Sequence, residues 1–489
     1  MFEIGQRIRV DYQVATILYI GTVDGYGEQI WVGVEWDDEK RGKHDGLVKG
    51  KRYFQTKNPT GGSLLKIQNI PSALDLLAEI QSRYIGDEDD VENVIDLNQT
   101  SKKIELVGMQ KTAMKQSNIE KLVNIVLDNQ CVGLAPPANS PIFPICRELN
   151  LYGNLIYKWQ TVRDILKYFP RIQELNLRRN KMQELEDNKE EEEDVYSKSC
   201  SKLVISECSI VQSSISPILQ NFPNVIELVA FGNGLSKVNI IETASINLQV
   251  LDLEDNPIHR FENITGNFEN LLHLNLSNCG ISEVNEIDEK KFPKLESLNL
   301  RGNRITSWMS INSLKTLRNL KKLLIDCKNF ECEKGVNVFE VIIAKLEGLE
   351  DLNRFDVSEV ERRSAEIRFL NKYAKLKNEP EHGKDVERMI QKHGEPSIDT
   401  AKKGLNVVKI RIQYEDRIET RNLPLGMTVQ KIRDMLARLF KISSSSDIRI
   451  FLEMSENSKT HRIELDNPLR EFGHYSPSEE RDVLVIESS

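Results

Sequence analysis

A short pattern recurs nine times along the middle of this sequence of 489 residues. Each unit has a leucine or isoleucine, a second apolar residue two positions later and, in most units, Asn or Cys three positions after that. Alternating apolar residues predict a short strand, and a fixed period of this length is typical of stacked repeats. The units start at Ile125, Leu149, Leu175, Leu203, Leu228, Leu251, Leu274, Leu298 and Leu323, spaced 23 to 28 residues apart.

The sixth position of the unit gives the strongest evidence for the type of repeat. Its side chain is expected to satisfy backbone groups in the turn after each strand. The first and last units have Gln130 and Lys328 there, as expected for terminal caps. The pattern therefore predicts an α/β leucine-rich-repeat solenoid over residues 119–376, closed by helices within residues 339–376. In the seven inner units the position holds Asn154, Asn180, Cys208, Asn233, Asn256, Cys279 and Asn303.

Such a solenoid offers an extended concave surface at the non-leucine strand positions. Aromatic residues and both charge signs at these positions suit a protein partner, although each side chain taken singly is better explained as ordinary solvated surface. No acid, base and nucleophile are grouped, so catalysis is not expected on this face. The insertion "ELEDNKEEEEDVYS" in the third unit is predicted to be a disordered loop. The candidate contact residues are Tyr152, Arg178, Phe231, Asp252, Glu254, His273 and Arg301.

The length, composition and net charge of the sequence limit the classes of protein to which it can belong. The length predicts about three domains. No run of 18 apolar residues occurs, so no membrane span is predicted, and the N-terminus lacks the apolar core of a signal peptide. Seven scattered cysteines indicate reduced thiols of a cytosolic protein rather than zinc ligands or disulfides. The net charge of −9 argues weakly against nucleic acid as the main partner.

Residues 1–68 are rich in β-branched residues, aromatic residues and glycine, and they predict a small β-barrel. Strands are expected over residues 10–20 and 31–36. Between Lys40 and Lys57 there are seven basic residues and a single acid, Asp45, with aromatic residues nearby. A basic loop beside aromatic surface could bind single-stranded nucleic acid, bind an acidic peptide that ends in an aromatic residue, or be a solvated face over an ordinary core.

The Gly42-Lys43 pair does not belong to a phosphate-binding loop. That loop needs Ser or Thr after the lysine to ligate Mg²⁺, and here His44 and Asp45 follow. Nucleotide binding is therefore not predicted for this loop.

The stretches "WVGVEWDD", "GKHDG" and "TGGSLLK", with "YF" between the last two, resemble the CAP-Gly domain along the whole first module. CAP-Gly domains bind acidic C-terminal tails, typically the Glu-Glu-Tyr end of α-tubulin. The resemblance implies that Lys43 faces glutamates, that Asp45 and the glycines shape the loop, and that an aromatic-lined slot takes the terminal tyrosine. The residues expected to bind the tail are Tyr26, Trp31, Gly42, Lys43, His44, Asp45, Gly46, Phe54 and Leu64.

Two positions depart from the usual CAP-Gly pattern. His44 stands where asparagine is usual, and Leu64 stands where phenylalanine is usual. A lower tail affinity than in typical members is therefore expected.

Two linkers are predicted. Residues 69–118 contain a helix candidate at residues 74–84 and an acidic run at residues 87–92. The polar stretch 377–404 is the second linker.

Residues 405–489 resemble a ubiquitin-like β-grasp (α+β). Alternation from Val408 to Tyr414 predicts a half-buried strand, and Thr428 is expected to cap a helix with its apolar face at Val429, Ile432 and Leu436. Strands are expected at residues 448–452 and 483–486. No Gly-Gly end is present, so binding rather than conjugation is expected.

The order of the three modules resembles that of the tubulin-folding cofactors. The resemblance implies a cytoplasmic, cytoskeleton-associated chaperone that binds α-tubulin. With sister cofactors and a small Arf-like GTPase, it would assemble or dissociate the αβ-tubulin heterodimer. No enzyme activity, cofactor, metal, nucleic acid or membrane is expected, and GTP hydrolysis would belong to tubulin and the GTPase. The alternatives are a microtubule-binding adaptor and a ubiquitin-like adaptor to the proteasome.

Overall fold

The computed structural model forms two compact units, Met1–Arg304 with Thr316–Leu320 and Leu324–Asp326, and Ile305–Lys315 with Lys321–Leu323 and Cys327–Ser489. The acidic run at residues 87–92, residues 186–194 of the insertion and residues 397–404 of the second predicted linker lie outside the described residues. No helix of the described part is both long and apolar enough to cross a membrane. The structure describes residues 2–85, 119–185, 195–241, 246–285, 287–332, 336–396, 407–442, 448–456, 459–478 and 482–488.

The N-terminal module contains an antiparallel sheet in the order β1-β2-β3-β6. The sequence predicts one strand over residues 10–20, but Asp11 and Tyr12 have φ values of 48° and 64° and form a tight two-residue turn. The β-branched pattern conceals this turn because neither residue is glycine. The elements are β1 (Arg7–Val10), β2 (Gln13–Thr22), β3 (Ile30–Trp36), β4 (Leu47–Val48), β5 (Lys51–Arg52), β6 (Gly62–Lys66) and η1 (Ile67–Asn69).

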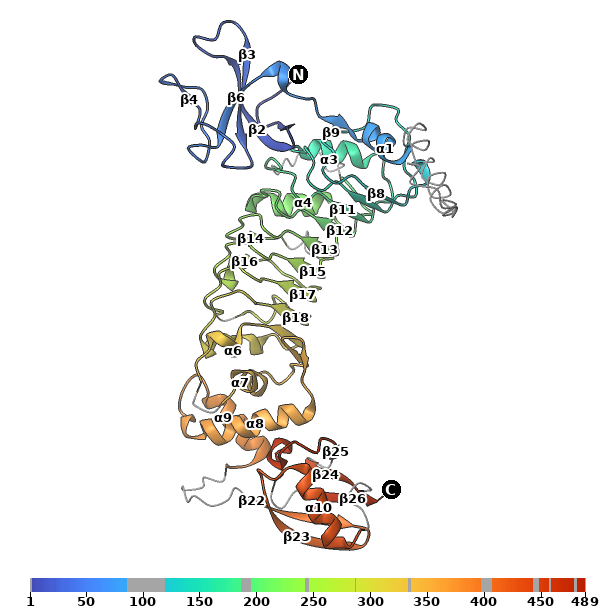
Figure 1. The fold of residues 1–489 in the computed structure, drawn as a ribbon, viewed down its shortest axis with the longest axis vertical. Helices are drawn as coiled ribbons and strands as arrows, with labels where there is room; N and C mark the ends of the chain where they lie inside the picture. The colour runs from blue at the N-terminus through green and yellow to red at the C-terminus, as the bar shows by residue number, and fades with distance from the viewer. Residues whose placement is uncertain are drawn as a thin grey trace, which may run out of the picture. The chain divides into compact units, whose positions relative to one another are not determined.

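The repeat strands of the first unit pair in parallel, and Figure 1 shows them as successive rungs. Leu149 lies opposite Ile125, and Leu175 lies opposite Leu149, so the predicted register of the repeats is confirmed. The described strands are β8 (Asn124–Val126), β10 (Glu148–Asn150), β11 (Glu174–Asn176), β12 (Lys202–Val204), β13 (Glu227–Val229), β15 (Val250–Asp252), β17 (His273–Asn275) and β18 (Ser297–Asn299).

The sixth-position side chains satisfy the turns between repeats, as predicted. The Oδ1 atom of Asn154 accepts from the N–H of Gln130 at 3.1 Å and that of Val132 at 3.0 Å. Its Nδ2 donates to Leu127 O at 2.7 Å. In a cysteine repeat, the Cys208 thiol donates to a carbonyl oxygen at 3.0 Å. A cysteine therefore supplies the donor but not the amide acceptor.

The first predicted linker begins with folded elements. Strand β7 pairs in parallel with β9, and α1 buries Leu76 and Ile80 completely, so residues 74–85 belong to the first repeat. The sequence indicates the helical periodicity of this stretch, but it does not show which element the helix packs against. The elements around the repeats are β7 (Leu74–Asp75), α1 (Leu76–Ile85), η3 (Ile119–Lys121), β9 (Val132–Leu134), α3 (Trp159–Leu166), η4 (Gln212–Ser214), α4 (Ile215–Asn221), β14 (Val238–Asn239), η5 (Phe261–Asn263) and β16 (Ile264–Thr265).

The second unit continues with helices, and the second predicted linker is wrong over residues 383–393. These residues form α9, which buries Val386 and Met389 completely against the helices before it. The three apolar residues of this charged stretch, Val386, Met389 and Ile390, are too few to reveal a helix by periodicity. The elements are α6 (Trp308–Ser313), η6 (Leu314–Thr316), β19 (Lys322–Leu324), η7 (Cys327–Asn329), α7 (Val338–Lys345), β20 (Asp351–Leu352), β21 (Phe355–Asp356), α8 (Glu359–Tyr373), η8 (Ala374–Leu376) and α9 (Gly383–His393).

The C-terminal module is a five-stranded sheet in the order β23-β22-β26-β24-β25, with β22 and β26 parallel and α10 packed on one face. This is the predicted β-grasp topology. Thr428 precedes α10, but its side chain makes no capping bond. The N–H groups of Val429 and Gln430 instead donate to Arg470 O and Pro468 O. The elements are β22 (Val407–Tyr414), β23 (Arg417–Pro424), α10 (Val429–Phe440), β24 (Ile448–Glu456), β25 (Lys459–Glu464), η10 (Phe472–Tyr475) and β26 (Val483–Ser488).

Candidate functional site

Residues 42–46, called the tail loop below, lie against the beginning of β6. The N–H of Lys43 donates to Gly62 O at 2.7 Å, and that of Gly62 donates to His44 O at 2.8 Å. A Cβ on Gly42 would lie 2.1 Å from Thr60 O. Gly46 has a φ of 96°, and a Cβ there would lie 2.1 Å from Phe54 O. Both glycines are therefore required by close backbone approach.

Asp45 and His44 hold the tail loop from within. The Asp45 carboxylate pairs with Arg52 at 2.9 Å and accepts from the N–H of Leu47 at 3.2 Å. These two bonds lower the pKa of Asp45. The Nδ1 atom of His44 accepts from the N–H of Gly46 at 3.0 Å, and burial lowers the pKa of His44. Both side chains therefore fix the shape of the loop.

An aromatic pair lies at the other end of β3. The rings of Tyr26 and Trp31 meet edge to face with centroids 5.3 Å apart, and Tyr26 is 44% exposed. The Nζ atom of Lys49 lies 4.2 Å from the centre of the Tyr26 ring. Lys49 and Gly50 have φ values of 50° and 81°, so the β4–β5 turn presents this ammonium to the aromatic pair.

Phe54 and Leu64 take different positions from each other. Phe54 is only 6% exposed, and its ring covers Gly33, where a Cβ would lie 2.4 Å from the ring. Phe54 therefore packs in the interior between Gly33 and the tail loop, and it does not line an open slot. Leu64 is half-buried on β6 directly opposite Gly33, on the strand next to Trp31.

The positive charges between Lys40 and Lys57 are partly neutralised by ion pairs. Arg41 pairs with Asp11, Lys51 with Asp24 and Arg52 with Asp45. Lys43 is exposed, and its ammonium has no ion-pair partner among the residues that the structure describes. Lys43 is thus available to an acidic ligand, whereas the three paired residues are already engaged.

The concave face of the solenoid brings together three of its predicted contact residues. Arg178 lies over Phe231 at 4.5 Å and over Tyr152 at 5.7 Å, and it pairs with Glu207 at 2.8 Å. Arg179 also pairs with Glu207 and donates to the Tyr152 hydroxyl at 2.7 Å. We call these five residues the concave cluster. Its packed rings and paired charges form a defined surface.

The other predicted concave residues are not part of this cluster. Asp252 Oδ1 accepts from the N–H of Glu254 and from Asn275 Nδ2, each at 3.0 Å. The N–H of Arg301 donates to Asn299 Oδ1 in the same way. Asp252 therefore occupies a structural turn position that the single-sequence pattern did not distinguish from free surface. His273 is exposed at the start of β17.

Sequence reasoning missed two supporting residues, Arg52 and Lys49. Both lie in the basic run, but only the folded hairpin shows that one holds Asp45 and the other covers Tyr26. No group of three His, Cys, Asp or Glu side chains in the described ranges could hold a metal ion.

Comparison with known proteins places these modules in context. A CAP-Gly domain model matches residues 4–70, and a Leucine Rich repeat model matches residues 293–307. Tubulin-specific chaperone E of Mus musculus is 30% identical over 530 residues, covering 99% of this chain and 98% of the relative. The chain belongs to the tubulin-specific chaperone E family.

A second relative agrees with this family membership. Tubulin-specific chaperone E of Drosophila melanogaster is 27% identical, with 99% of this chain and 98% of the fly protein covered. The solved C-terminal ubiquitin-like domain of mouse tubulin-specific chaperone e is 28% identical and covers 19% of this chain and 94% of that chain, with a TM-score of 0.16. Both full-length relatives are named as chaperones, and their similarity to this chain extends across all three modules.

Proposed function

We propose that this protein is a tubulin-folding chaperone that binds α-tubulin and assembles or dissociates the αβ-tubulin heterodimer. The observation that carries the proposal is the near-complete coverage, 99% of the chain, by relatives named tubulin-specific chaperone E. Sister cofactors and a small Arf-like GTPase act with it in the cytoplasm, in association with the cytoskeleton. The chain itself has no catalytic role in this proposal.

The tail loop binds the acidic C-terminal tail of α-tubulin in this mechanism. Its exposed Lys43, which has no ion-pair partner among the described residues, attracts the glutamates, while Tyr26, Trp31 and Leu64 receive the terminal aromatic residue. This lysine and the partly exposed aromatic pair on one small module support this assignment. The fixed loop geometry limits the entropy that is lost when the tail binds.

The solenoid binds the body of α-tubulin through the concave cluster, and the ubiquitin-like module contacts partner cofactors. When one site of α-tubulin is bound, the second site is held at a high effective concentration. A weak tail contact can therefore raise overall affinity by about 10²-fold or more. This explains why the departures at His44 and Leu64 are tolerable.

A mixing experiment tests the proposal. Pure αβ-tubulin is incubated with this protein, with and without the sister cofactors, and is analysed by size-exclusion chromatography. A stable complex with α-tubulin but not β-tubulin is expected. Co-sedimentation with microtubules while the dimers stay intact would instead establish a microtubule-binding adaptor.

A charge reversal locates the tail contact. Lys43→Glu is expected to weaken α-tubulin capture about tenfold, because it replaces attraction by repulsion at an exposed site. Lys121→Glu, at an exposed lysine outside the N-terminal module, is the matched control and should change little. Equal capture by the Lys43 variant and the wild type would move the main contact to the solenoid.

A further inference from the structure

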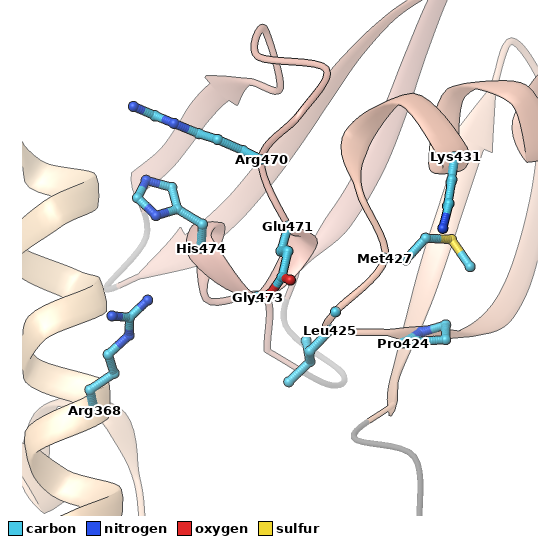
Figure 2. A pocket seen from close by; sticks show the side chains of 10 residues that line it. Arg368, Pro424, Leu425, Met427, Lys431, Arg470, Glu471, Gly473 and His474 are labelled. Carbon is cyan, nitrogen blue, oxygen red and sulfur yellow. The ribbon is translucent and has the colours of Figure 1, made fainter. Parts of the chain in front are cut away.

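A pocket of 880 Å³ in the second unit lies between α8 and the loops of the β-grasp. In Figure 2, Arg368 reaches toward it from α8, Lys431 stands on α10, and Arg470 and His474 lie on the segment that includes η10. Basic side chains from separate elements therefore line one pocket. The lining residues are Arg368, Pro424, Leu425, Gly426, Met427, Lys431, Arg470, Glu471, Gly473 and His474.

The walls of the pocket are held together before any ligand binds. The N–H of Phe472 donates to Met427 O at 2.8 Å, and that of Gly473 donates to Leu425 O at 2.7 Å. On the α8 side, the Ser364 hydroxyl donates to His474 O at 2.7 Å. The opening is thus preorganised, which reduces the entropic cost of binding.

The pocket carries an excess of positive charge. Lys431 and Arg470 are exposed and have no ion-pair partner within the described part of the chain. Arg368 pairs with Glu340 through Nη1 at 2.7 Å and stays 47% exposed. Burial is the largest cause of the lowered pKa of His474, and Arg470 and Arg368 lower it further. An imidazole inside the pocket therefore experiences the positive field.

The polar groups of the pocket do not suit a phosphate or a nucleotide. A phosphate cradle needs free backbone N–H groups, but those of Val429, Gln430 and Gly473 already donate to carbonyl oxygens of neighbouring loops. No Phe, Tyr or Trp is among the described lining residues, so a base has no such ring to stack on. We therefore assign recognition to the side-chain cations that line the pocket.

An extended acidic chain fits the remaining features. The apolar side chains of Pro424, Leu425 and Met427 lie among the cations, and Leu469, next to Arg470 in the chain, is 83% exposed. Separated cations around apolar surface match carboxylates spaced along a peptide that also carries an apolar side chain.

We propose that this pocket binds an acidic segment of a partner protein. Its carboxylates pair with Lys431, Arg470 and Arg368, and an apolar side chain rests on Leu425 and Met427. The site is distinct from the tail loop, so the proposal goes beyond the proposed function and does not depend on it.

The test uses the full chain and a short fluorescein-labelled peptide made of Glu-Glu-Leu repeats with an amidated end. The Lys43→Glu background removes the basic side chain of the tail loop. Fluorescence anisotropy should show saturable binding, which weakens at higher salt because exposed charges are screened. Adding K431E and R470E together should reduce the affinity at least tenfold, while the matched control R417E, on exposed β23, should leave it within twofold.

A second readout reports on the pocket itself. In the NMR spectrum, the pKa of His474 should rise when the peptide binds, because carboxylates offset the field of Arg470 and Arg368. The same peptide with Gln in place of Glu should cause no such rise. Unchanged affinity in the K431E/R470E protein would overturn the proposal. Displacement of the peptide by inorganic phosphate or ATP at low concentration would also overturn it, in favour of a small-anion site.

Discussion

The Nδ1 atom of His44 accepts a hydrogen bond from the backbone N–H of Gly46 at 3.0 Å. An imidazole can accept there only when Nδ1 carries no proton, so the folded loop holds His44 neutral with its proton on Nε2. An asparagine oxygen can accept the same bond. This explains physically how histidine can stand where CAP-Gly domains usually have asparagine.

The tail loop should therefore tolerate asparagine better than alanine. His44→Asn is expected to bind a peptide ending in Glu-Glu-Tyr within about twofold of the wild type, because the acceptor is kept. His44→Ala leaves the N–H of Gly46 unpaired and should cost about 1 kcal/mol of loop stability, with weaker binding. Anisotropy titrations of the three proteins compare these affinities.

Burial of His44 lowers its pKa, and this sets the pH dependence of the loop. Because the folded pKa of His44 lies below its usual value near 6.5, the unfolded loop takes up the proton first, and stability falls as the pH drops below about 6.5. Wild-type affinity should hold from pH 7.5 to about 6.5 and then decline, while His44→Asn stays flat. A wild-type affinity that rises toward pH 6 would show that a protonated His44 contacts the tail.

Removal of a sixth-position asparagine should destabilise the solenoid strongly. Asn256 is fully buried and accepts from the N–H groups of Asn233 and Leu235, each at 3.0 Å. Asn256→Ala leaves both unpaired and is expected to cost about 3 kcal/mol or more. Asn256→Cys keeps one hydrogen-bond donor, the thiol, and should therefore cost less stability than Asn256→Ala. Hydrogen exchange at the two amides measures the effect, and Asn270→Ala, at a half-buried asparagine outside the sixth positions, should leave them protected.

The packing of α9 should depend on one buried carboxylate. Asp385 pairs with Lys345 at 2.8 Å and with Lys315 at 2.6 Å, and the Lys345 side chain is fully buried. Asp385→Ala leaves that charge without a carboxylate and should cost about 3–5 kcal/mol. Limited proteolysis should then cut within residues 383–393. Replacement of the neighbouring exposed Lys384 by Ala should leave α9 resistant, and resistance in both variants would show that apolar packing alone holds the helix.

Acid should destabilise the second unit through His382. Burial, with Lys345 adding to it, lowers the pKa of this histidine to about 4, and its ring lies 4.4 Å from that of Tyr373. Its folded pKa is below the unfolded value near 6.5, so stability is lost as the pH falls from about 6.5 to about 4, by about 3 kcal/mol in total. The difference in melting temperature between wild type and His382→Phe, which keeps a ring, should therefore shift in favour of the variant as the pH falls. A difference in melting temperature that stays the same at every pH would contradict this prediction.

Local patterns predicted the repeats well because each unit carries its own evidence. A strand with alternating leucines and a sixth-position amide needs only its neighbours in the next unit to fold. Helix α9 and the turn at Asp11 and Tyr12 escaped prediction, since the first depends on distant packing partners and the second on a backbone conformation rare for such residues. In the N-terminal module, the sequence indicated Lys43 and Tyr26 as tail-binding candidates but could not show that Phe54 is buried.

The sequence by itself determined the three modules, their order and the spacing of the solenoid strands, because periodicity and glycine placement are properties of short segments. Only the tertiary structure decided which charges are free. Lys43 and Arg52 look alike in the sequence, yet one is exposed without an ion-pair partner in the described chain and the other holds Asp45. The cations at the β-grasp pocket come from residues 368 to 470, and no local pattern joins them. Charge pairing depends on distances between segments far apart in the chain, and folding alone sets those distances.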